Sequence, residues 1–157
     1  MRPEVISKMQ EIVGKDYVIS GEENIQPYVF DEVEPVQRPE PNCDSIVVKP
    51  ANTEEIAEIM KYANENKVIV VVRGGGTGLC GACTPIYESI ILSVERLNKI
   101  LEIDRKNMVA VLETGVTLAD LLEELKKHEG LGFPVHPGDE GCQMGGMAVM
   151  NAGGSRA

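Results

Sequence analysis

The chain has no tryptophan, and aromatic residues make up only 4% of its 157 residues. Basic side chains are also scarce, since 15 Lys and Arg stand against 25 Asp and Glu, a formal net charge of −10 at pH 7. A nucleic-acid partner requires a basic surface, so this balance argues against one. The hydrophobic content of 43% argues against disorder. We therefore expect a globular chain with a core of Val, Ile, Leu and Met.

Long apolar runs are absent too. The longest strictly apolar run covers residues 68–72, whereas a membrane-spanning helix needs about 20 residues. The N-terminus has neither the apolar stretch nor the cleavage site of a secretory signal. The four cysteines, Cys43, Cys80, Cys83 and Cys142, are then expected to be free thiols in a reducing compartment. These features predict a cytoplasmic protein without a transmembrane segment.

The N-terminal quarter of the sequence favours short helices. We expect them at residues 3–14 and 21–30, the second opened by Ser20 as its cap. A proline-rich stretch with little apolar content follows and predicts a surface connection. Residues 1–44 are therefore interpreted as an N-terminal helical extension.

A βαβ pattern comes next. Strand 46–48 is followed by a helix that Thr53 caps, and then by the apolar run 68–72. Because this run has no polar alternation, it is typical of a strand buried on both faces. We expect the two strands to be parallel and joined by a right-handed crossover.

The second half of the sequence has a different pattern. Three short β runs cover residues 89–93, 100–103 and 108–112, and residues 104–107 resemble a hairpin turn. Thr117 then caps an amphipathic helix. The sequence thus predicts an α+β fold: a small parallel βαβ subdomain, then a mixed or antiparallel β subdomain with helices.

The segment after the apolar run is rich in glycine. Residues 73–81 read Arg-Gly-Gly-Gly-Thr-Gly-Leu-Cys-Gly, a backbone that can adopt positive φ and approach a ligand closely. Loops at the carboxyl end of a parallel strand bind phosphates in α/β proteins, and consecutive amides there form an anion-binding nest. A tight turn without a ligand is the alternative.

Two familiar phosphate-binding motifs do not fit this loop. Gly76, Gly78 and Gly81 match the spacing of the dinucleotide fingerprint, but the fingerprint must open a helix. Here Pro85 and a β run follow, which argues against an NAD-binding Rossmann domain. Ala82 stands where the P-loop pattern requires lysine.

A second glycine-rich segment covers residues 137–154. Its small residues recur without turn spacing, which suits a backbone packed against a flat ligand. Tight packing within the protein explains the pattern about equally well. The presence of two such segments favours a large cofactor that carries phosphate.

The sequence resembles the FAD-binding domain of the p-cresol methylhydroxylase and vanillyl-alcohol oxidase type. Within this family, it is most similar to glycolate oxidase flavin subunits and D-lactate dehydrogenases. The resemblance runs from about residue 45 to the end. The carrying motifs include Arg73–Leu79, Thr84-Pro85, Ile91–Ser93, Leu97–Ile100, Gly115–Leu118, His136–Gly138, Gly145-Gly146 and Asn151–Gly154.

The resemblance implies a role for each glycine segment. Residues 74–79 are expected to bind the FAD pyrophosphate through backbone amides, and residues 137–139 and 143–154 to line the cofactor. Thr77 stands where members with covalent flavin often carry histidine, so non-covalent FAD is expected. Arg73 and Arg156 are the cations beside these motifs. The expected cofactor-binding residues are Arg73, Gly74, Gly75, Gly76, Thr77, Gly78, Leu79, Gly81, Pro137, Gly138, Asp139, Gln143, Gly145, Gly146, Ala148, Asn151 and Gly153.

Family members are much longer than this chain, and we expect a truncated FAD-binding domain over residues 45–157. We expect the substrate-binding cap of the family to be absent, so no catalytic residue is assigned, and no metal is expected. The resemblance implies a flavin-dependent dehydrogenase or oxidase that takes a hydride from a small 2-hydroxy acid. Its electron acceptor could be a partner protein or an iron–sulfur subunit. On its own the chain is expected to be inactive and to bind FAD weakly or not at all.

Other functions remain open. The same fold could serve as a module that docks a partner chain. Cys80 and Cys83 have a metal-like spacing, but Cys43 and Cys142 provide no second pair, so small loop residues are expected. His128 ends a helix and is expected to complement its dipole.

Overall fold

The computed structural model describes residues 1–154. The chain divides into two compact units, one of residues 1–96 and one that begins at Leu97. Each unit has its own hydrophobic core. Ile25, Val29, Val47 and Ile91 form a core cluster in the first unit, and Leu118, Cys142 and Met147 form one in the second.

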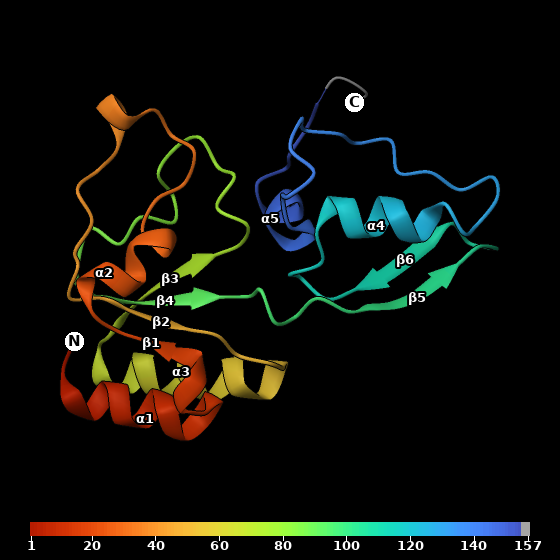
Figure 1. Ribbon diagram of the computed structural model, residues 1–157. Helices are drawn as coiled ribbons and strands as arrows, with labels where there is room; N and C mark the ends of the chain where they lie inside the picture. The colour runs from red at the N-terminus through yellow and green to blue at the C-terminus, as the bar shows by residue number, and fades with distance from the viewer. Residues whose placement is uncertain (155–157) are drawn as a thin grey trace. The chain divides into compact units, whose positions relative to one another are not determined.

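The first unit is built on a four-stranded sheet with the order β1-β2-β4-β3, where β1 is Val18–Ile19, β2 Ile46–Val48, β3 Ile69–Arg73 and β4 Ser89–Ser93. Strands β2 and β3 both pair in parallel with β4, and β1 pairs antiparallel with β2 (Figure 1). The expected parallel βαβ unit is therefore present. Its crossover joins two strands that are separated by β4.

This order corrects two predictions. The apolar strand β3 is at the edge of the sheet, and Val72 keeps 60% of its surface exposed. All five residues of β4 are buried instead. The β run at 89–93 had been expected beside the later antiparallel strands. Burial on both faces thus follows from position in the sheet, which an apolar run alone does not reveal.

Helices cover both faces of the sheet (Figure 1). Helices α1 (Pro3–Val13) and α3 (Thr53–Asn66) lie on one face. The short α2 (Glu22–Ile25) and the 3-10 turn Gln26–Tyr28 lie on the other. The register partners Val47 and Ile91 point toward this second face and pack against Ile25 and Val29.

Two predicted helix caps are wrong. Asn52, not Thr53, caps α3, because its extended backbone lets the side chain accept a hydrogen bond from the Glu55 amide. Gly21, with a φ of +94°, is the residue at the cap position of α2, and no side chain caps this helix, so Ser20 is not its cap. The second helix also spans fewer residues than the predicted 21–30.

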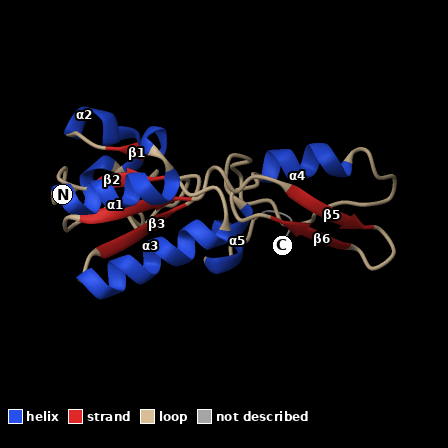
Figure 2. Cartoon of the chain, turned by 90° about the horizontal axis from the view of Figure 1, so that it is seen from below, coloured by secondary structure: helices blue, strands red, loops and turns tan. Residues whose placement is uncertain are grey.

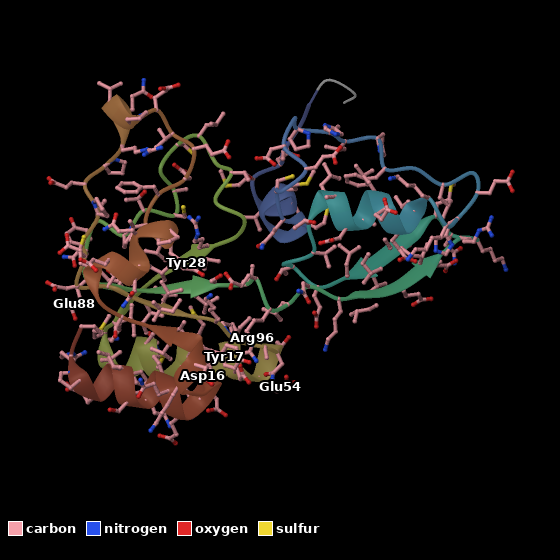
Figure 3. The ribbon with its side chains drawn as sticks, viewed as in Figure 1. Asp16, Tyr17, Tyr28, Glu54, Glu88 and Arg96 are labelled. Atoms are coloured by element: carbon pink, nitrogen blue, oxygen red, sulfur yellow. The ribbon has the colours of Figure 1, made fainter. Side chains whose placement is uncertain are left out.

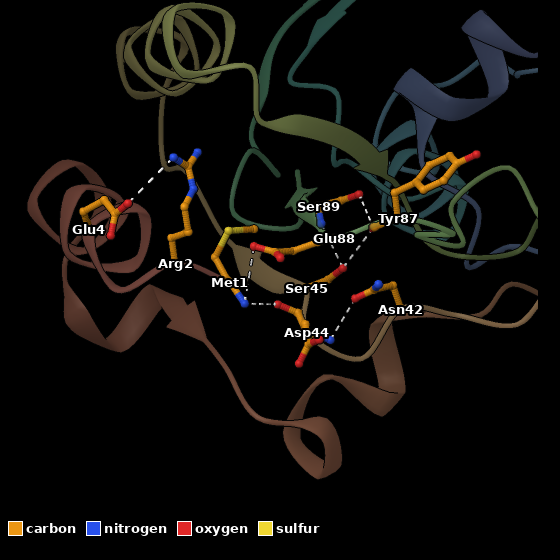
Figure 4. Close-up of polar contacts among 9 residues, drawn as sticks. All are labelled: Met1, Arg2, Glu4, Asn42, Asp44, Ser45, Tyr87, Glu88 and Ser89. Atoms are coloured by element: carbon orange, nitrogen blue, oxygen red, sulfur yellow. Dashed lines mark hydrogen bonds and ion pairs between the residues drawn. The ribbon is translucent and has the colours of Figure 1, made fainter.

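Residues 1–44 and the sheet belong to the same unit, and several polar contacts connect them. The Met1 ammonium donates to the carbonyl of Asp44 at 2.7 Å and lies 3.5 Å from the Glu88 carboxylate (Figure 4). The Arg96 guanidinium stacks on the ring of Tyr17, 3.4 Å from its centroid (Figure 3). The N-terminal helices are thus an integral part of the first unit.

The second unit contains a β hairpin and two helices (Figure 2). Strands β5 (Ile100–Asp104) and β6 (Val109–Leu112) pair antiparallel, which confirms the predicted hairpin. Thr117 caps α4 (Leu118–Leu125) in a capping box with Asp120, as predicted for this helix start. Helix α5 covers Met144–Val149. No helix within residues 1–154 has the length and apolarity needed to cross a bilayer.

Candidate cofactor site

The glycine loop begins at the carboxyl end of β3. Arg73 is the last residue of that strand and is the register partner of Ser93, the last residue of β4. Residues 74–88 contain neither helix nor strand. This confirms that the loop does not open a helix and excludes the Rossmann arrangement for it. The loop occupies the edge of a parallel sheet where α/β proteins bind ligands.

The backbone of this loop presents unpaired donors. Within residues 1–154, the amides of residues 74–79 make no hydrogen bond to the protein, and all six residues are half-buried or exposed. Consecutive free amides on a loop can together bind an anion. The amides of residues 74–79 are therefore free to donate to an anionic group.

Two of the loop glycines are needed for contacts within the protein. Gly76 has a φ of +75°, and a side chain there would run into the guanidinium of Arg73. A Cβ on Gly78 would lie 3.1 Å from Oδ2 of Asp31. The sequence predicted that these glycines let a ligand approach, with a tight turn as the alternative. Their contacts with Arg73 and Asp31 give a further reason for glycine at both positions.

Arg73 is anchored at the base of the loop. Its guanidinium donates to the carbonyl of Phe30 at 2.7 Å, to that of Pro27 at 3.0 Å, and to Sγ of Cys83 at 3.1 Å. It also lies over the ring of Tyr28, 5.8 Å from the centroid. The expected positive charge is therefore present near the loop. These three hydrogen bonds connect the guanidinium to residues 27–30 and to Cys83.

A second polar cluster lies where β2 and β4 end, and sequence reasoning missed it. Nζ of Lys49 lies 2.6 Å from a Glu95 carboxylate oxygen and donates to the Tyr28 hydroxyl at 2.6 Å. Partial burial opposes the charged form of Lys49, but the hydrogen bonds that its ammonium donates to Glu95 and Tyr28 outweigh this and raise the lysine pKa. The signal that could have found the cluster is the position of Lys49 and Glu95 just after parallel strands.

The second glycine segment belongs to the second unit and is partly helical. Residues 144–149 form α5, where an irregular loop had been expected. Gln143 precedes this helix and pairs with Thr117 in an isolated β bridge. Its Oε1 atom is buried and has no partner within the described residues. An unpaired buried oxygen is costly, and a donor on a ligand or a water could satisfy it.

The remaining predicted residues of this segment differ in their surroundings. The Asp139 carboxylate accepts a hydrogen bond from the nearby Gly141 amide at 2.6 Å. Gly138 has a φ of +106° and donates to the His136 ring at 3.3 Å. Open space surrounds the Cβ positions of Gly146 and Gly153, and Ala148 and Asn151 are exposed. Pro137 is half-buried, and Arg156 lies outside the described residues.

The cysteines do not form a metal site within residues 1–154, where no group of three potential ligands is found. Cys80 is exposed and Cys83 is buried. Burial raises the pKa of the Cys83 thiol, and the nearby Arg73 only partly opposes this shift. At mildly alkaline pH we therefore expect iodoacetamide to label Cys80 at least about tenfold faster than Cys83, because the thiolate is the nucleophile. Peptide mass spectrometry of a time course measures both rates, and equal rates would contradict the burial of Cys83.

The parallel sheet and the open glycine loop are features of a nucleotide-cofactor domain. The model of the family described as the FAD binding domain matches residues 45–157, and the chain belongs to this family. It is 48% identical over 130 residues to a D-lactate dehydrogenase of Archaeoglobus fulgidus, a match that covers 83% of this chain and 29% of that protein. The chain thus spans less than a third of this relative.

Two solved structures share the fold. An alkyldihydroxyacetonephosphate synthase superposes with a TM-score of 0.84 at 21% identity, over 98% of this chain and 33% of that one. Substrate-bound p-cresol methylhydroxylase superposes with a TM-score of 0.68 at 24% identity, over 84% and 25%. The predicted fold type is therefore confirmed, and FAD is the cofactor of the family. At these identities the two structures establish the fold alone.

Proposed function

We propose that this chain supplies FAD binding to a flavin-dependent dehydrogenase that oxidises D-lactate or a similar 2-hydroxy acid. The run of unpaired amides at residues 74–79 carries this proposal, because it lies in the segment that matches the FAD-binding family. The similarity to a D-lactate dehydrogenase supports the substrate class. Bound FAD supplies the acceptor for the hydride that leaves the substrate α-carbon.

Each segment has a distinct role in this proposal. The amides of residues 74–79 bind the pyrophosphate, and Arg73 contributes a fixed positive charge at the base of the loop. A positive charge near the pyrophosphate is needed because the chain as a whole is strongly acidic and would otherwise repel it. In the second unit, Gln143, Gly146 and the residues around Gly138 line other parts of the cofactor. FAD is bound without a covalent link.

Substrate oxidation requires residues beyond the ones described. The acid–base groups and the substrate-anchoring cation belong to the rest of a longer enzyme. The chain alone is expected to bind FAD weakly and not to oxidise D-lactate. Bleaching of the flavin absorbance when D-lactate is added to the chain with FAD would contradict the second expectation.

A charge placed in the loop tests the phosphate site. Thr77→Asp adds a carboxylate among the free amides, and we expect FAD binding to weaken by at least about tenfold through repulsion of the pyrophosphate. Titration of the nitrogen-15-labelled chain with FAD, followed by amide chemical shifts, detects even millimolar affinity. The shifts are expected to concentrate at residues 74–79.

Thr77→Asn is the matched control, because it has the same size as the aspartate and no charge. It is expected to bind FAD within about threefold of the unaltered chain, a difference below 1 kcal/mol. Equal affinity of the aspartate and asparagine variants would place the pyrophosphate away from this loop. Shifts confined to other segments would lead to the same conclusion.

A further inference from the structure

Asp31 joins the N-terminal segment to the glycine loop. Its side chain is buried, with 6% of the residue surface exposed. Oδ2 accepts the amide of Gly81 at 2.8 Å, and Oδ1 accepts that of Val33 at 3.1 Å. Beside it, the Glu32 amide donates to the carbonyl of Gly78 at 2.8 Å. Both ends of the 78–81 stretch are therefore held by residues 31–32.

The glycine loop also contacts the N-terminal segment through a side chain of its own. Arg73, at its start, donates to the carbonyls of Pro27 and Phe30. Residues 27–32 thus bind the loop at its beginning through Arg73 and at its end through Asp31. The amides between these two anchors are the unpaired ones of residues 74–79. Residues 27–32 themselves lie outside the segment that matches the FAD-binding family.

We propose that Asp31 is a positioning residue for the cofactor, which holds the glycine loop in the shape that presents its amides to the FAD pyrophosphate. This inference rests on the proposed function. A carboxylate cannot bind pyrophosphate directly, since both are anions. Asp31 can favour FAD only through the loop, by increasing the fraction of molecules in the binding-competent shape.

Because Asp31 is charged, the direction of the change in FAD affinity on its replacement distinguishes two interpretations. If the carboxylate acted only as a nearby negative charge, its removal would strengthen binding of an anion. If it positions the loop, Asp31→Asn weakens binding, because the two amides bind different carboxylate oxygens and asparagine replaces one of these with an NH2 group, which cannot accept. The part-buried amide of Gly81 or the buried amide of Val33 then loses its partner. The two interpretations predict opposite changes.

We expect Asp31→Asn to weaken FAD binding roughly tenfold, the effect of losing one charge-assisted hydrogen bond. Amide chemical shifts during FAD titration measure the affinity. Hydrogen–deuterium exchange without FAD measures the loop itself, and residues 74–83 are expected to exchange faster in the variant. Exchange in α1 and β4, monitored in the same experiment, establishes that the first unit is folded.

Glu32→Gln is the matched control. It removes the same charge from the adjacent residue, whose side chain is exposed. It is expected to leave loop exchange unchanged and FAD affinity equal or slightly higher. Asp31→Glu is the second variant for the case in which Asp31→Asn does not fold. It keeps the charge and lengthens the side chain, so weaker FAD binding there also supports positioning.

The outcomes separate this inference from the proposed function. Faster loop exchange in Asp31→Asn but not in Glu32→Gln, together with weaker FAD binding, supports it. If Asp31→Asn matches Glu32→Gln in both measurements, or binds FAD more tightly than the unaltered chain, the inference is overturned. If the unaltered chain gives no shifts with FAD even at millimolar concentration, FAD binding by the chain alone is ruled out. The exchange comparison then still decides whether Asp31 shapes the loop.

Discussion

Replacing Ile91 by alanine is expected to lower the free energy of unfolding of the first unit by about 2–5 kcal/mol, the usual cost of truncating a fully buried isoleucine. Ile91 is fully buried in the central strand β4, where it packs with Val47, Ile25 and Val29. Its removal leaves a cavity in the layer between the sheet and α2. The protein offers a convenient probe, because its tyrosines all precede residue 97 and tryptophan is absent. Tyrosine fluorescence during urea unfolding therefore reports on the first unit alone.

Val72→Ala is the matched control for this experiment. Val72 belongs to the edge strand β3 and is 60% exposed, so its truncation is expected to cost about 0.5 kcal/mol. The ratio of the two effects tests the strand order directly. A cost for Val72→Ala as large as that for Ile91→Ala would mean that β3 is buried as fully as β4, which would contradict its position at the edge of the sheet.

The strand order also marks the limit of what the sequence could predict. The run at residues 68–72 is wholly apolar, whereas β4 begins with Ser89 and ends with Ser93. Both serines are nevertheless buried, and their hydroxyls have partners: Ser89 donates to the Tyr87 carbonyl at 2.6 Å and Ser93 to Glu95 at 3.0 Å. Satisfied hydroxyls can be buried at little cost. Only the pairing of distant strands determines which of them is central.

Local signals were more informative. The hairpin at residues 100–112 and the Thr117 cap were predicted correctly, because turns and caps depend on residues a few positions apart. The glycine loop was located for the same reason. Asp31 was missed because its partner Gly81 is fifty positions away. Nothing near Asp31 in the sequence indicates a contact with the loop.

Gly145 and Gly146 are adjacent in α5, and both were predicted to bind the cofactor, but their surroundings are opposite. A Cβ on Gly145 would lie 2.7 Å from the Thr114 Cβ and 2.9 Å from its carbonyl oxygen. That carbonyl also accepts the Gly145 amide at 2.9 Å, so the backbone cannot easily move away. We expect Gly145→Ala to destabilise the second unit by about 1–3 kcal/mol, the cost of overpacking. Hydrogen–deuterium exchange in α4 and α5 measures it, since the second unit has no tyrosine.

Gly146→Ala is the control, because nothing lies within 4 Å of its Cβ position. Alanine is a better helix former than glycine, so this variant is expected to leave α5 unchanged or to stabilise it by up to about 1 kcal/mol. For Gly146→Ala, FAD affinity is a more informative measurement than stability. If Gly146 lines the cofactor, the added methyl group weakens FAD binding although the fold is intact. Unchanged affinity would remove Gly146 from the site and leave only Gly145, which packs against Thr114, with a structural reason to be glycine.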